Sequence, residues 1–62
     1  MRLVRLTNQN AHNFIGYEIL FKTRGEYIVK KIIDANNISI KINHPDLNNQ
    51  LNMTRKIFVL IE

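Results

Sequence analysis

The stretch YEILFKTRGEYIVKKII, residues 17–33, decides the fold of this chain. Tyr17–Lys22 and Glu26–Ile33 are rich in β-branched and aromatic residues, and only Thr23–Gly25 separates them. Two such runs on either side of a short segment that contains glycine are typical of a β-hairpin. The sequence therefore predicts a pair of antiparallel strands in the middle of the chain.

The turn of this hairpin determines which side chains share a face of the sheet. A two-residue Arg24-Gly25 turn would place Arg24 at positive φ, which is unfavourable for a residue with a Cβ atom. A three-residue turn, Thr23–Gly25, needs positive φ only at Gly25, so we expect that turn. It predicts these opposite pairs: Lys22 with Glu26, Phe21 with Tyr27, Leu20 with Ile28, Ile19 with Val29, and Glu18 with Lys30.

This register assigns every side chain of the hairpin to one of two faces. The side chains predicted to face the core are Tyr17, Ile19, Phe21, Tyr27 and Val29. The side chains predicted to face outward are Leu20, Lys22, Ile28 and Lys30. Both faces therefore carry apolar residues, and the outer one carries lysines as well.

The segments before this hairpin predict one strand and one loop. Arg2–Thr7 alternates loosely between polar and apolar residues and predicts a first strand. Asn8–Gly16 contains three asparagines, which favour local turns over the interior of a helix. We therefore expect a long loop there, and a single helical turn capped by Asn8 and ended by Gly16 is the alternative.

Two further strands are predicted after the hairpin. Asp34–Asn37 is a cluster of turn-forming residues. Ile38–Asn43 then alternates isoleucine with polar residues, as a half-buried strand does. Thr54–Ile61 is almost entirely apolar after Lys56 and predicts the last strand.

The segment between these two strands, His44–Met53, is polar and contains Pro45. Leu47 and Leu51 lie four residues apart, as one helical turn would place them, and proline is tolerated at the start of such a turn. We therefore expect a loop with one short helical or 3₁₀ turn and no strand.

The order of these elements is strand, long loop, three strands, short helical turn and last strand. It resembles an SH3-like barrel, whose last two strands are commonly joined by a 3₁₀ turn. The resemblance covers the whole chain and implies one all-β domain of five strands over residues 1–62. An OB-like barrel is the second choice for the fold. The side chains predicted to be almost fully buried are Ile19, Phe21, Val29, Ile40 and Val59.

The composition argues against an enzyme, a metalloprotein and a membrane protein. The chain has no cysteine, so disulfides and thiolate metal sites are absent. Ser39 is the only serine, no histidine is placed beside it, and the two glycines form no phosphate-binding loop. We expect no cofactor, no metal and no catalytic residue. Met1–Asn10 lacks the apolar segment of a secretory signal, which predicts an intracellular protein that is not secreted.

The net charge of +4 favours an anionic partner. Four cations come from the hairpin and the strand after it, and we expect them to form one basic outer face: Lys22, Arg24, Lys30 and Lys41. Small barrels bind nucleic acid through such a face, with cations on the phosphates. The first functional hypothesis is therefore a small accessory nucleic-acid-binding protein.

The apolar residues that a chain of this size cannot bury lead to a second hypothesis. We expect four of them to form a patch on the outer face: Leu20, Ile28, Phe58 and Leu60. Exposed apolar patches mark contacts with other proteins. The alternative is therefore a protein-interaction or assembly subunit, such as a minor structural component of a virion or larger complex. Its partner could also be another copy of the same chain, which would make it a homo-oligomer.

Overall fold

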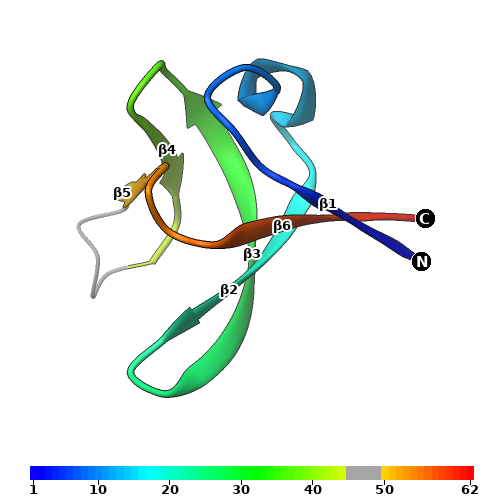
Figure 1. Cartoon of the computed structure of the whole chain (residues 1–62), viewed down its shortest axis with the longest axis vertical. Helices are drawn as coiled ribbons and strands as arrows, with labels where there is room; N and C mark the ends of the chain where they lie inside the picture. The colour runs from blue at the N-terminus through cyan, green and yellow to red at the C-terminus, as the bar shows by residue number, and fades with distance from the viewer. Residues whose placement is uncertain (45–49) are drawn as a thin grey trace.

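The computed structural model describes residues 1–44 and 50–62, and these form one antiparallel sheet with two edges. The sheet order is β1-β6-β2-β3-β4-β5, with β1 and β5 at the edges (Figure 1). The strands are β1 (Arg2–Arg5), β2 (Glu18–Thr23), β3 (Glu26–Ala35), β4 (Ser39–Ile42), β5 (Gln50–Asn52) and β6 (Ile57–Ile61). The prediction of an all-β fold is confirmed.

The predicted count of five strands is wrong, because the described residues contain a sixth, β5. This strand lies inside the segment that we expected to be a loop without strand structure. Its sequence places buried Leu51 between two exposed polar residues, and Leu51 pairs with Ile40 of β4. The other leucine of the predicted helical turn, Leu47, lies outside the described residues.

The turn between β2 and β3 differs from the predicted one. Thr23 pairs with Glu26, so the turn has two residues, with Arg24 at φ 52° and Gly25 at φ 80°. A primed turn of this kind matches the right-handed twist of the flanking strands, whereas a turn with negative φ angles would splay them. That match outweighs the local cost of positive φ at Arg24.

The shorter turn moves the whole register of the hairpin by one residue. Leu20 now pairs with Val29, Phe21 with Ile28, and Ile19 with Lys30. Val29, predicted to be buried, is 43% exposed on the outer face, and Ile28 lies on the inner face against the core. Tyr27 also faces outward instead of inward and is 66% exposed.

β3 is the longest strand and takes part in both halves of the sheet. Residues 26–31 pair with β2. Ile32, Asp34 and Ala35 pair with β4, and the register shifts between Ile32 and Asp34. Figure 1 shows this strand crossing the centre of the molecule. Asp34 and Ala35, which we expected in a turn, are therefore strand residues. An irregularity of this kind bends a strand and lets one sheet curve around a core.

The core is built from almost every element. Buried apolar side chains come from all the strands after β1, from the segment after β1 and from the 3₁₀ turn Ala11–Phe14: Leu6, Ala11, Ile19, Phe21, Ile32, Ile40, Ile42, Leu51, Ile57 and Val59. Four of the five predicted core residues are confirmed, Val29 being the exception. Ile38 precedes β4 and is 69% exposed, so only Ile40 and Ile42 of that alternating series are buried.

The expected long loop between the first two strands contains a single 3₁₀ turn, Ala11–Phe14, as the alternative prediction allowed. Its N-cap position is Asn10 and not Asn8, and Gly16 follows it with φ 92°. Ala11 is fully buried, and Phe14 packs against the core and against the ring of Tyr17. No helix in residues 1–44 or 50–62 is long and apolar enough to cross a membrane.

Candidate binding surfaces

Four side chains form a continuous row on the outer face of the sheet. Arg5 of β1 lies opposite Phe58 of β6, Phe58 opposite Leu20 of β2, and Leu20 opposite Val29 of β3. Side chains directly opposite one another in a sheet are in contact distance. The row therefore crosses four neighbouring strands, and Arg5 is its only charged member.

Two further pairs flank this row on the same face. Leu3 lies opposite Leu60, and Lys22 lies opposite Tyr27. We call these residues together the outer apolar face: Leu3, Arg5, Leu20, Lys22, Tyr27, Val29, Phe58 and Leu60. Leu3 is 51% exposed, whereas Leu20, Phe58 and Leu60 are half-buried.

Both cations of this face lie over aromatic rings. The Arg5 guanidinium carbon is 5.9 Å from the centroid of the Phe58 ring, and the Lys22 ammonium nitrogen is 5.5 Å from the centroid of the Tyr27 ring. In such contacts the positive group is attracted to the electron-rich face of the ring. The pair Glu18–Lys31 lies on the same side of β2 and β3. The face is thus apolar at its centre, and its margin carries charges of both signs.

Three of the four residues predicted as a protein interface belong to this face. Leu20, Phe58 and Leu60 lie on it, whereas Ile28 lies on the inner face because of the changed register. Sequence analysis missed Leu3, Tyr27 and Val29. Two of these lie in β3, where only the correct hairpin turn could have assigned them to the outside.

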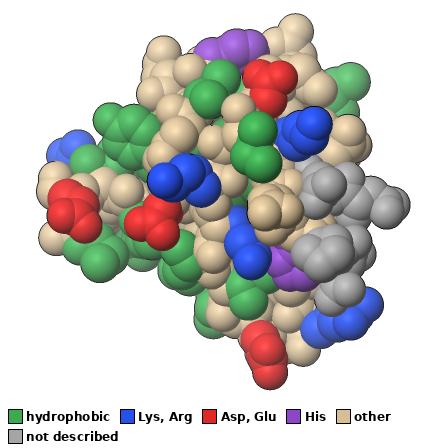
Figure 2. Space-filling view, turned by 180° about the vertical axis from the view of Figure 1, so that it is seen from behind, with side chains coloured by type: hydrophobic (Ala, Val, Ile, Leu, Met, Phe, Trp, Pro, Cys, Tyr) green, Lys and Arg blue, Asp and Glu red, His purple; other side chains and the backbone are tan. Residues whose placement is uncertain are grey.

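The four cations predicted to share a basic face are separated by the structure. Lys22 points outward, but Lys30 lies opposite inward-facing Ile19 and is half-buried. Arg24 is at the tip of the hairpin, and Lys41 is on β4 opposite Asp34 and Gln50. The prediction that Lys22 and Lys30 share the outer face is therefore wrong. On the face seen in Figure 2, Lys and Arg side chains are likewise dispersed among acidic and hydrophobic ones.

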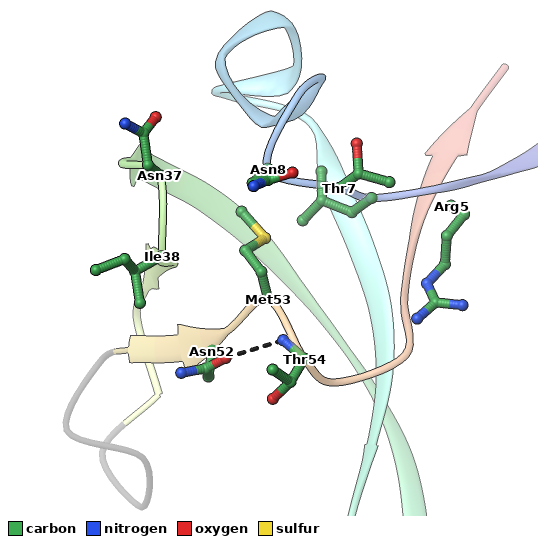
Figure 3. Close-up of a pocket in the computed structure, with 9 residues that line it drawn as sticks. Arg5, Thr7, Asn8, Asn37, Ile38, Asn52, Met53 and Thr54 are labelled. Atoms are coloured by element: carbon green, nitrogen blue, oxygen red, sulfur yellow. Dashed lines mark hydrogen bonds between the residues drawn. The ribbon is translucent and has the colours of Figure 1, made fainter.

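A groove of about 570 Å³ lies between the end of β1 and the segments that flank β4 and β5. Its lining comes from three short segments: residues 5–8, 37–38 and 52–54. In Figure 3 the Met53 side chain lies in the middle, with Thr7 and Asn8 on one side and Asn52 and Thr54 on the other. Among the described residues the lining is mostly amide, hydroxyl and apolar groups, without a carboxylate.

No group of three or more His, Cys, Asp or Glu side chains among the described residues could hold a metal ion. Comparison of the chain with protein-family models, with curated proteins and with solved structures found no match. The function must therefore be argued from the surfaces themselves.

Proposed function

We propose that this protein is a non-enzymatic interaction module that binds another protein through the outer apolar face. The observation that carries the proposal is the row from Phe58 through Leu20 to Val29, which is apolar although it lies outside the core. The described residues already bury ten apolar side chains in one core, and the outer row is not part of it.

The composition of the face supports the same conclusion. The centres of protein interfaces are enriched in aromatic residues and arginine. Tyrosine and arginine are also the residues whose truncation most often weakens binding strongly. The outer apolar face contains Tyr27, Phe58 and Arg5 around its aliphatic centre, and Arg5 and Lys22 at its margin would add charge specificity.

We also propose that the curved sheet is an SH3-like barrel. Support comes from the order of its elements and from β3, which pairs with β2 in its first half and with β4 in its second. In such a barrel the inner face is filled by the protein's own side chains. Binding would therefore take place on the outside or at the loops.

A pair of charged variants tests the proposed interface. Val29→Glu places a carboxylate in the apolar row, and Ile38→Glu makes the same change at an exposed position outside it. Both should keep the wild-type melting temperature, since both positions are exposed. In affinity purification from cells that produce the protein, a stoichiometric partner should be retained by wild type and Ile38→Glu and lost by Val29→Glu. Equal recovery with both variants would exclude the outer apolar face.

Nucleic-acid binding is the second candidate, and the exposed Tyr27 is the observation that favours it. Its ring faces outward beside the Lys22 ammonium group, and Arg24 lies at the nearby hairpin tip. An exposed aromatic ring next to cations is the arrangement on which single-stranded nucleic acid stacks. The hairpin, and not the predicted four-cation face, would then be the contact site.

Titration of a labelled single-stranded oligonucleotide separates this candidate from the first. Two phosphate contacts, at Lys22 and Arg24, predict a slope of log affinity against log salt of about −1.4, at about −0.7 per contact. Tyr27→Ala should weaken binding by about 1–3 kcal/mol, whereas Lys56→Gln should only slightly reduce it. An absence of binding at low salt up to about 10⁻⁴ M would eliminate nucleic acid as the partner.

A further inference from the structure

β1 is an edge strand whose free side is only partly covered. The Leu6 N–H donates to the Ile57 C=O at 2.8 Å, in the same register as the pairs Val4–Val59 and Arg2–Ile61. Because hydrogen-bonded and non-hydrogen-bonded pairs alternate in an antiparallel ladder, Leu3 and Arg5 turn their backbone groups away from β6. These groups point to the free side of the sheet.

The Asn10 side chain covers the far end of this free side. Its Oδ1 accepts a hydrogen bond from the Thr7 N–H at 2.8 Å, and its Nδ2 donates to the Arg5 C=O at 3.0 Å. The amide thus occupies the place that the backbone of a neighbouring strand would take. The Leu3 N–H, the Leu3 C=O and the Arg5 N–H have no partner among residues 1–44 and 50–62.

Both charged side chains of β1 are positive. Glu62 follows Ile61, the partner of Arg2, and lies beyond the paired part of β6. The first acidic residue of the chain is Glu18, and β1 itself has the sequence Arg2-Leu3-Val4-Arg5. Both arginines are exposed, and β6 contains no charged residue. A strand laid antiparallel along β1 would meet a cation at each end and two apolar residues between them.

We propose that the free edge of β1 binds an extended segment of another protein, in which two apolar residues lie between two carboxylates. The bound segment would extend the sheet by one strand, with its main chain on the open groups of Leu3 and Arg5. Its carboxylates would lie opposite Arg2 and Arg5, where opposite charges across a strand pair are stabilising. A second copy of this chain fits the edge poorly, because pairing of β1 with itself brings together two arginines from each copy and no acid.

This proposal goes beyond the proposed function, because it uses the backbone edge of β1, although Leu3 and Arg5 also contribute side chains to the outer apolar face. The probe is a fluorescently labelled peptide with blocked termini and a Glu-Val-Val-Glu centre. Its binding to the wild-type protein is measured by fluorescence anisotropy. The matched control peptide has a Lys-Val-Val-Lys centre. The Glu peptide should bind at least about tenfold more tightly, a difference of about 1.4 kcal/mol. Absence of Glu-peptide binding, or equal affinity for the two peptides, would overturn the proposal.

Two further measurements test the geometry. Two versions of the Glu peptide are N-methylated at alternate amides, one at the amides that face β1 and one at the amides that face away. The first should not bind, and the second should bind like the unmodified peptide. The double variant Arg2→Glu/Arg5→Glu should lose the Glu peptide and gain the Lys peptide, whereas Val29→Glu, three strands away in the sheet order, should bind like wild type.

Each other outcome of these measurements either overturns the proposal or supports it. Equal tolerance of both methylation phases would show that the backbone of β1 is not used and would overturn strand addition. A wild-type dimer in sedimentation analysis that dissociates on Leu3→Pro would assign the edge to a second copy and overturn the proposed occupant. Loss of the cellular partner by Val29→Glu without loss of peptide binding would support both proposals, because the β1 edge would then bind independently of the centre of the outer apolar face.

Discussion

Phe21→Ala should leave this domain largely unfolded at room temperature. Phe21 is 1% exposed and lies between Ile28 and Ile57 on neighbouring strands. Its ring also packs edge-on against the ring of His44, with 6.3 Å between the ring centroids. Removing a buried phenylalanine side chain costs about 3–5 kcal/mol. At about 0.05–0.15 kcal/mol per residue, a chain of this length has a total stability of about 3–9 kcal/mol.

The measurement is thermal unfolding followed by circular dichroism. Tyr27→Ala is the control, because it removes a side chain of similar size from a mostly exposed position of the same hairpin. It should lower the melting temperature only slightly. A Phe21→Ala protein that melts like wild type would show that the inner and outer faces of the hairpin are wrongly assigned.

Asn10→Ala should destabilise the domain and loosen the contact between the long loop and the edge of β1. It removes the two hydrogen bonds to Thr7 and Arg5, and each contributes about 1 kcal/mol to stability. We therefore expect the free energy of unfolding in urea to fall by about 2 kcal/mol. Because the change also uncovers more of the β1 edge, the variant should self-associate at lower protein concentration.

Asn13→Ala provides the comparison for this variant. Asn13 lies in the same loop, and its side chain is exposed. Its replacement should change stability by less than about 0.5 kcal/mol, as is usual for surface positions. If the two variants have equal stability, the Asn10 amide does not hold the edge of β1.

The sequence predicts the class of the fold better than its register. Ile40 and Ile42 are buried as their alternation indicates, and Ile19 and Phe21 are buried as expected. These residues alternate with polar neighbours or lie in a strand with one clear face. Glu26–Ile33 has no such signal, because apolar residues occupy both of its faces and a slip of one residue still buries apolar surface.

The choice between a two-residue and a three-residue turn then determines the register of the hairpin. The prediction considered only one of the two physical effects that act on this choice. It counted the cost of positive φ at Arg24 and left out the twist of the strands, which favours a two-residue primed turn. As a result Val29 and Ile28 were exchanged between the faces. The candidate interface depends on the same choice, which is why Tyr27 and Val29 could not be found from composition alone.

β5 was missed for a different reason. A strand of three residues shows a single apolar residue between two polar ones, which is too short a pattern to distinguish from a loop. Only its pairing with β4 makes Leu51 part of the core. The covered edge of β1 was also beyond sequence reasoning, since it depends on where the loop places the Asn10 amide.

The pairing of β1 with β6 has a consequence for how the chain is synthesised. Arg2 lies opposite Ile61, so among the described residues the first strand finds its sheet neighbour up to 59 positions later in the sequence. Such distant contacts form slowly, because a long loop must close before they give any stabilisation. On the ribosome, β1 therefore stays without its neighbour until the last strand has left the exit tunnel. During that interval its arginines would help to keep the nascent segment soluble.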